Sequence, residues 1–216
     1  MESSRIAIII PAYNEEKTIE EVVNSVKNYG VPIVIDDGSE DNTAKISKKM
    51  GAIVVIHKKN KGYDSALNSG FKIAKQNQFI IAITVDADLQ HDFKTIPEFI
   101  KILNAEADIV TGIRNNTQRI SEKIFKITSN FLWGLKDPLC GLKGYKMHVY
   151  DDFGFFDTYN SIGTELLIRS RLKEKKIIQI EINTKKRKDK PRFGNFLIAN
   201  YKILRSLFLS LTIIKS

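Results

Sequence analysis

Short apolar runs alternate with segments of helical spacing along the first half of this chain, and four of the five runs stop at a polar cluster. Short apolar runs bounded by turn residues are typical of buried strands, whereas the spacing of Ile19, Val22 and Val26 is that of a helix. The runs are Arg5–Ile10, Ile33–Ile35, Ile53–Ile56, Phe79–Val85 and Asp108–Thr111. This alternation predicts an α/β fold, with a mostly parallel sheet flanked by helices on both faces.

The polar clusters follow the carboxyl ends of the predicted strands. They are Pro11–Glu15, Asp36–Ser39, Asp86–His91 and Gly112–Arg114. Open parallel sheets bind ligands in the crevice outside the carboxyl ends of their strands. We therefore expect the four clusters to meet in one ligand site, although turn formers and helix caps would account for Asp36–Ser39 and for Asn14 taken singly.

The pattern changes beyond residue 115. Helices are predicted at 120–135 and 163–173, and strands at 142–145 and 177–182. A basic loop at 185–194 precedes an apolar C-terminal helix. We expect residues 1–195 to form one domain, with a first half at 1–114 and an extension at 115–195, followed by the helix at 196–216.

Positive charge is concentrated in one segment of the chain. The net charge is +9, and between Arg169 and Arg192 there are 11 Lys or Arg against 3 Asp or Glu, a balance of +8. A solvated helix face explains such a run, and so does an anionic ligand or an anionic membrane surface. We expect no nucleic-acid partner because no nucleic-acid-binding motif accompanies the charge.

Cys140 is the single cysteine, so an intrachain disulfide is excluded and a reducing compartment is expected. The first apolar run is too short for the core of a signal peptide, and no uninterrupted apolar stretch reaches the length of a membrane span. These features favour a cytoplasmic protein.

Asp86-Ala87-Asp88 directly follows the predicted strand that ends at Val85. In an extended chain, residues two apart point the same way, so both carboxylates can face one ion. Mg²⁺ and Mn²⁺ are hard cations that prefer oxygen ligands and also bind substrate phosphates. We expect these two aspartates to hold such an ion, with Gln90 or His91 close enough to add a ligand. The ion would neutralise charge on a leaving diphosphate.

In this order and spacing, the motifs of the chain resemble the family 2 glycosyltransferases with the GT-A fold. The resemblance rests on Ile-Ile-Pro-Ala-Tyr-Asn-Glu, Ile-Asp-Asp-Gly-Ser-Glu-Asp-Asn-Thr, Asn60-Lys61-Gly62, Asp86-Ala87-Asp88-Leu89-Gln90-His91 and Thr111-Gly112-Ile113-Arg114. Two later segments, Asp137–Lys143 and Gly163–Leu167, are similar to the dolichyl- or polyprenyl-phosphate hexose synthases of that family. The match covers nearly the whole chain.

This resemblance implies roles for individual residues. The residues expected to bind the nucleotide-sugar in the first half are Pro11, Tyr13, Glu15, Asp36, Asp37, Lys61, Asp86 and Arg114. The metal ligands would be Asp86, Asp88 and Gln90. The residues expected to face acceptor phosphates are Arg119, Arg187, Lys190 and Arg192. The loop at 185–192 departs from the family by placing Pro191 where a serine is common, which puts one acceptor contact in question.

The implied reaction is transfer of a hexose, with inversion, from a donor of the GDP-mannose or UDP-glucose type to a polyprenyl or dolichyl phosphate. A lipid phosphate is already anionic and needs little help from a base. The alternative acceptor is a hydroxyl of a cell-surface glycan or lipid, which needs a carboxylate to remove its proton. Asp137 and Glu165 are the candidates for a catalytic role in the second half, beside Asp88, and pairing with nearby cations is their structural alternative.

Two other classes of protein fit less well. A nucleotidyltransferase would open with a Gly-rich phosphate loop, whereas the first predicted strand here runs into Pro11-Ala12-Tyr13-Asn14. A non-catalytic nucleotide binder would not need the paired aspartates.

The apolar C-terminal helix is interrupted by Lys202 and Arg205. We expect it to lie in the plane of a membrane surface, at the cytoplasmic face, with both cations reaching outward to water. The alternatives are packing of the helix against the domain, or against a second copy in a homodimer.

Overall fold

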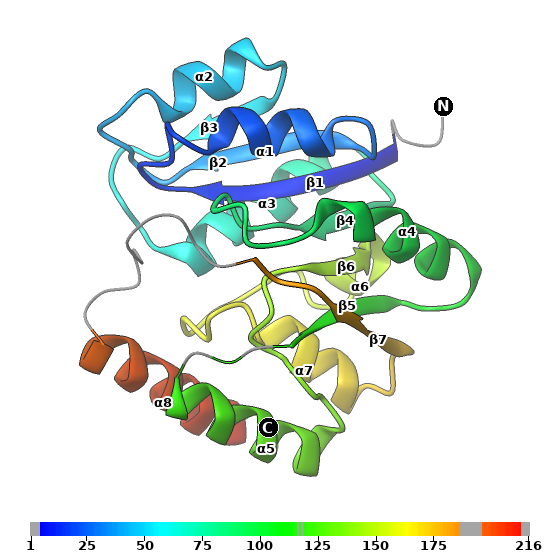
Figure 1. Ribbon diagram of the computed structural model, residues 1–216. Helices are drawn as coiled ribbons and strands as arrows, with labels where there is room; N and C mark the ends of the chain where they lie inside the picture. The colour runs from blue at the N-terminus through cyan, green and yellow to red at the C-terminus, as the bar shows by residue number, and fades with distance from the viewer. Residues whose placement is uncertain (1–4, 116, 118, 186–195, 213–216) are drawn as a thin grey trace.

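A seven-stranded sheet in the order β3-β2-β1-β4-β6-β5-β7 organises the computed structural model, which describes residues 5–115, 117, 119–185 and 196–212 (Figure 1). The strands are β1 Ile6–Ala12, β2 Val31–Asp36, β3 Ile53–Ile56, β4 Ile81–Thr84, β5 Ile109–Arg114, β6 Lys143–Lys146 and β7 Ile177–Ile182. Every pairing is parallel except those of β6 with β4 and with β5. The predicted mostly parallel sheet is therefore confirmed.

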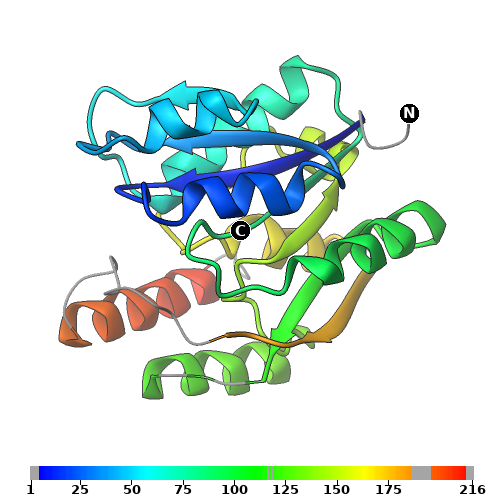
Figure 2. The same ribbon diagram turned by 45° about the horizontal axis from the view of Figure 1, so that its top comes forward.

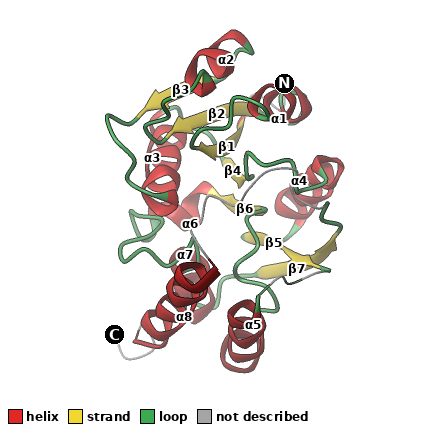
Figure 3. Ribbon diagram, turned by 60° about the vertical axis from the view of Figure 1, so that its left-hand side comes forward, coloured by secondary structure: helices red, strands yellow, loops and turns green. Residues whose placement is uncertain are grey.

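Helices cover both faces of this sheet (Figure 3). The helices are α1 Ile19–Val26, α2 Thr43–Lys49, α3 Tyr63–Gln76, α4 Ile96–Ala105, α5 Ile120–Trp133, α6 Met147–Asp151, α7 Glu165–Leu172 and α8 Phe196–Thr212, with a 3₁₀ turn, η2, at Phe93–Thr95. One core lies between the sheet and α1 and α4. The other lies between the sheet and the helices α3, α5, α6, α7 and α8.

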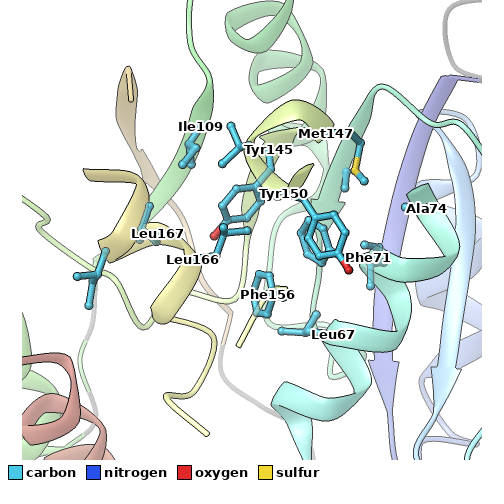
Figure 4. Close-up of a cluster of buried hydrophobic side chains, with 14 of the residues drawn as sticks. Leu67, Phe71, Ala74, Ile109, Tyr145, Met147, Tyr150, Phe156, Leu166 and Leu167 are labelled. Carbon is cyan, nitrogen blue, oxygen red and sulfur yellow. The ribbon is translucent and has the colours of Figure 1, made fainter. Parts of the chain in front are cut away.

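The second core shows how helical spacing produces a packed layer. In α3, Leu67, Phe71 and Ala74 lie on one face because they are separated by three or four residues. Phe71 stacks on Phe156 with ring centroids 4.7 Å apart, and it forms a T-shaped pair with Tyr145 of β6 (Figure 4). These contacts tie the first half of the chain to the second.

Strand β6 enters the sheet antiparallel between β4 and β5. Its bounds lie one residue beyond the predicted strand at 142–145. The register pairs Thr84 of β4 with Lys143, and Lys143 with Thr111 of β5. Because β6 begins where β4 and β5 end, the loop just before it is brought to the carboxyl edge of the parallel strands.

Helices α5 and α8 lie side by side at one end of the molecule (Figures 1 and 2). Asn200 of α8 accepts hydrogen bonds from the backbone N–H and the hydroxyl of Ser121, in the first turn of α5. Ala199, Ile203 and Leu207 of α8 are buried. Within the described residues, no helix combines the length and the apolar character that crossing a membrane requires.

Candidate active site

One cleft of about 390 Å³ opens at the carboxyl edge of β1, β2, β4 and β5. Nine of the residues expected to bind substrate or metal line it: Pro11, Tyr13, Glu15, Asp37, Asp86, Asp88, Gln90, Arg114 and Arg119. The four polar clusters that follow separate strands in the sequence therefore meet at one place. A volume of this size is within the usual range for a small-molecule site.

Asp37 lines the cleft and fixes the loop that precedes α3. Its buried carboxylate accepts hydrogen bonds from the backbone N–H groups of Lys61 and Gly62, at 3.0 and 2.7 Å, and contacts His57 Nδ1 at 2.6 Å. Gly62 has a φ of +93°, which favours glycine, so the chain can turn sharply here. Asp37 thereby holds the loop that leads into α3 against the cleft.

Two residues expected to bind nucleotide lie outside the cleft wall. Asp36 is buried, and its carboxylate accepts a hydrogen bond from the backbone of Ser39 at 2.9 Å, which closes the turn after β2. Lys61 meets Asp37 through its backbone rather than its side chain. Glu15 does line the cleft, and it accepts a hydrogen bond from the Thr18 hydroxyl at 2.9 Å.

Asp86 and Asp88 lie just after β4, and both line the cleft. The carboxylate of Asp88 accepts a hydrogen bond from the backbone of Gln90 at 3.0 Å, so the loop bends back on itself. Among the described residues, no group of three or more His, Cys, Asp or Glu side chains could by itself hold a metal ion. Two carboxylates and an amide suit a cation that completes its coordination with substrate phosphates.

The carboxylate of Asp86 is held on three sides. Tyr63 donates its phenolic hydrogen to Oδ1 at 3.2 Å, and His91 Nε2 lies 2.9 Å from Oδ2. A Cβ atom on Gly141 would collide with the same carboxylate. Burial favours the neutral acid, yet the hydrogen bond and charge of His91 keep the pKa of Asp86 below its ordinary value. Asp86 is therefore an anion at neutral pH, as a ligand for a hard cation must be.

Asp137 is the centre of an ion-pair network that includes Arg114, a residue of the cleft wall. Its fully buried carboxylate accepts hydrogen bonds from Arg114 Nε at 2.8 Å and Nη2 at 3.0 Å, and lies 3.0 Å from Lys126 Nζ. Burial favours the neutral acid, but Arg114 keeps the pKa of Asp137 below its ordinary value. Asp137 holds Arg114 in place, and it does not line the cleft. This geometry does not favour the expected catalytic role.

Glu165 is also engaged in structural contacts. It is fully buried, accepts hydrogen bonds from the backbone and hydroxyl of Thr158, and pairs with Arg169 Nε at 2.8 Å. It does not line the cleft either. The structural alternative, pairing with nearby groups, describes both carboxylates better than a role as proton acceptor.

Several cleft residues were not anticipated from the sequence. Glu122 is buried between two arginines, with Oε1 3.0 Å from Arg119 and Oε2 3.5 Å from Arg114. Lys202 of α8 and Tyr63 of α3 also line the cleft. The position of Glu122 three residues after Arg119, in the first turn of a helix, was the available signal. Lys202 had no such signal because only the packing of α8 on α5 places it there.

The basic loop begins beside the segment that follows Asp86 and Asp88. Lys185 donates its backbone N–H to the carbonyl of Gln90 at 2.8 Å, and Thr184 forms an isolated antiparallel β-bridge with His91. Three residues expected to contact acceptor phosphate, Arg187, Lys190 and Arg192, lie outside the described residues.

The sequence as a whole is similar to known glycosyltransferases. The profile of the family described as "Glycosyl transferase family 2" matches residues 7–170. A UDP-N-acetylglucosamine–dolichyl-phosphate N-acetylglucosaminyltransferase of Methanococcus voltae is 38% identical over 134 residues, covering 53% of this chain and 53% of that protein. A dolichyl-phosphate hexose transferase of Haloferax volcanii is 25% identical over 204 residues, covering 88% and 87%. The chain thus spans about half the length of the first of these relatives.

The fold is similar to that of a solved enzyme. Glucosyl-3-phosphoglycerate synthase from Mycobacterium tuberculosis, in complex with Mn²⁺, uridine diphosphate and phosphoglyceric acid, superposes with a TM-score of 0.78 at 22% identity. The superposition covers 95% of this chain and 78% of that one. At this identity the likeness shows a shared fold.

Proposed function

Because the chain belongs to glycosyl transferase family 2, we propose that it moves a hexose from a nucleoside diphosphate sugar to a polyprenyl or dolichyl phosphate. The observation that carries this proposal is the set of charged side chains that line the cleft. The paired carboxylates Asp86 and Asp88 line the same cleft as three basic residues, which are Arg114, Arg119 and Lys202. Relatives named as dolichyl-phosphate transferases support the same acceptor class.

The donor would lie across the carboxyl ends of β1, β2 and β4. Pro11, Tyr13 and Glu15 offer an apolar surface and a carboxylate to a nucleobase. Asp86 and Asp88, with Gln90, would hold Mg²⁺ or Mn²⁺, and such a cation neutralises charge on the departing diphosphate. The solved enzyme of the same fold contains Mn²⁺ and uridine diphosphate, which is consistent with a divalent metal.

The acceptor would enter beside α5 and α8. One oxygen of its phosphate attacks the anomeric carbon, a new carbon–oxygen bond forms, and the bond to the nucleoside diphosphate breaks with inversion. Arg114, fixed by Asp137, and Arg119 would stabilise the phosphate charge in this end of the cleft. A phosphate nucleophile is already anionic, so no carboxylate is required to activate it.

Transfer to a polyprenyl phosphate in detergent tests this proposal directly. UDP-, GDP- and dTDP-sugars are first screened by thermal shift with and without Mn²⁺, because a ligand that binds the folded state raises its melting temperature. The donor with the largest shift is then assayed with polyprenyl phosphate and with Asp88→Ala as the negative control. Metal-dependent formation of a lipid-linked sugar is expected. Donor binding without transfer to any polyprenyl phosphate would overturn the acceptor assignment.

A second candidate function, transfer to a hydroxyl, is favoured by Glu122. Within the described part of residues 115–195, it is the one carboxylate that lines the cleft, which makes it the best-placed base on the acceptor side. Loss of a general base typically slows a reaction by about 10²–10⁴-fold. Glu122→Gln should therefore lower kcat by that range for a hydroxyl acceptor, and by no more than a few-fold for a phosphate acceptor.

A further inference from the structure

Ile162 lines the cleft in a backbone conformation that an isoleucine rarely adopts. Its φ is +59°, in the left-handed region that favours glycine, and a branched side chain makes this region still less favourable. Asn160 and Gly163, close on either side, also have positive φ values. A conformation of this kind persists only where the surrounding contacts impose it, and such residues cluster at functional sites.

Asp64, in the first turn of α3, holds the backbone at this position. Its carboxyl group is buried, and its two oxygens accept hydrogen bonds from the N–H of Gly163 at 2.5 Å and from the N–H of Ile162 at 3.2 Å. Lys143 of β6 donates from Nζ to the carbonyl oxygen of Gly163 at 2.8 Å. Two elements far apart in the sequence therefore fix the backbone at residues 162 and 163.

Helix α8 holds the preceding residues of the same loop. Arg205 donates to the backbone carbonyl oxygen of Tyr159 at 3.1 Å, and the Ser206 hydroxyl donates to that of Ser161. Arg205 thus contacts this loop and Lys202 lines the cleft, whereas the sequence led us to expect that both cations reach outward to water. The loop is therefore held by α3, β6 and α8 together.

Tyr63 connects this loop to an aspartate that we expect to hold the metal. Its hydroxyl donates to Asp86 Oδ1 at 3.2 Å, and a Cβ atom on Gly163 would lie 3.3 Å from Cε1 of its ring. Gly163 therefore packs on the ring whose hydroxyl contacts Asp86. Ile162 is the neighbour of Gly163 in the chain, so its side chain lines the cleft close to this ring.

The side chain of Ile162 is the feature that needs a reason. Glycine at this position would adopt the same φ without strain and would keep the same backbone hydrogen bonds to Asp64. The side chain packs on the core beneath the loop, and it also forms part of the cleft wall. An aliphatic group in the wall of a cleft offers a ligand an apolar contact and excludes water from it.

We propose that Ile162 packs against the transferred hexose of the donor, and that Asp64 is the positioning residue that holds Ile162 in the cleft wall. This inference rests on the donor part of the proposed function. In a nucleoside diphosphate sugar the hexose is bonded directly to the diphosphate, so it would lie next to the cation-binding carboxylates. The C–H groups of a hexose ring give it an apolar face, which an aliphatic side chain can cover.

Calorimetric titrations with matched nucleotides isolate the contribution of the hexose. The probes are UDP with UDP-glucose, GDP with GDP-mannose and dTDP with dTDP-glucose, all with Mn²⁺ and without any lipid acceptor. The quantity compared is the affinity for the sugar nucleotide divided by the affinity for its parent diphosphate. The affinity for the diphosphate alone reports whether Tyr63 and Asp86 are undisturbed.

The variants are Ile162→Gly, Asp64→Asn and the two together. The matched control is Asn68→Ala, one turn further along α3, which removes hydrogen bonds to the backbone of Phe156 and Asp157 at the start of the same loop. Thermal melting reports the stability of every variant, because Ile162→Gly also removes packing on the core.

Ile162→Gly should lower the affinity ratio by about tenfold, because no aliphatic side chain then covers the hexose, and should change the affinity for the diphosphate by less than about twofold. Asp64→Asn should lower the ratio by a similar factor, because its amide offers one acceptor oxygen to two N–H groups. The double variant should lose no more than Ile162→Gly alone, because a positioning residue then has no side chain to hold. The control should melt at a lower temperature and keep its ratio.

An unchanged ratio in Ile162→Gly would overturn the proposal, and this variant decides the matter even where Asp64→Asn does not fold. Equal losses in Asn68→Ala and Asp64→Asn would mean that loosening of the loop, rather than the position of Ile162, lowers the affinity. Binding of none of the six nucleotides would overturn the proposed function as well. Nucleotide binding with unchanged ratios in all variants would overturn this inference alone.

Discussion

Replacing Gly141 by Ala is expected to disable the proposed metal site at Asp86 while leaving the fold intact. The new Cβ would overlap the Asp86 carboxylate, which Tyr63 and His91 already hold on its other sides. Either the carboxylate or the loop before β6 must move. Inserting a methyl group into a packed site typically costs about 1–3 kcal/mol of stability. Displacing a catalytic group by about 1 Å can cost on the order of 100-fold in rate.

Gly154→Ala provides a control with a similar cost but no contact with the site. Gly154 has a φ of +78°, and a Cβ there would meet no atom within 4 Å. The cost of alanine at that position is backbone strain of about 1–2 kcal/mol. For a protein of this length, each kcal/mol lowers the melting temperature by about 2–4 °C. Both variants should therefore melt a few degrees below the unsubstituted protein.

The assay compares metal-dependent binding of nucleoside diphosphate with transfer of the sugar. Gly141→Ala should lose most of the thermal stabilisation that the nucleotide and Mn²⁺ produce together, and its transfer rate should fall about 100-fold. Gly154→Ala should keep both. Transfer by Gly141→Ala within about threefold of the unsubstituted enzyme would refute the reasoning that Gly141 sets the position of Asp86. An equal loss of transfer rate in Gly154→Ala would mean that the effect comes from lowered stability alone.

Further outcomes follow from the same contacts. Asp86→Ala and Asp88→Ala should each abolish transfer with little change in melting temperature, and excess chelator should reproduce that loss; retained activity would refute the metal assignment. Asp137→Ala should lower the free energy of unfolding, measured in urea, by about 3 kcal/mol because it removes the fully buried carboxylate that pairs with the partly buried guanidinium of Arg114 and with Lys126. The low pKa of Asp137 also means that its stabilisation is present above its unfolded pKa of about 4 and is lost as the pH falls further. Burial and the charge of Asp157 raise the pKa of Asp64 to about 7, so stability should fall as pH rises from about 4 to 7. Asp64→Asn should flatten that slope in urea titrations at several pH values.

The strand-end clusters show what local pattern can predict. Apolar runs and helical spacing identify strands and helices because burial on a sheet or under a helix is repeated along the chain. Parallel strands bring their carboxyl ends to one edge, so the sequence alone predicts that Tyr13, Asp37, Asp86 and Arg114 converge. Their common position on the cleft wall agrees with that expectation.

The roles of individual carboxylates were harder to predict from the sequence. Asp137 and Glu165 stand in segments similar to the family's motifs, yet both are buried in ion pairs. No functional role was predicted for Glu122 from the sequence, although it lines the cleft. Whether a carboxylate faces solvent, substrate or a cation depends on which side chains surround it, and those come from distant parts of the chain.

By itself, the sequence determined the α/β architecture, the positions of its parallel strands along the chain and the edge of the sheet where a ligand site was expected. Each of these follows from short-range periodicity combined with the geometry of parallel sheets. Only the tertiary structure decided that β6 enters antiparallel between β4 and β5, that Gly141 lies against Asp86, and that α8 packs on α5. Those contacts join residues far apart in the chain, where the free energy of packing, rather than local conformational preference, selects the neighbour.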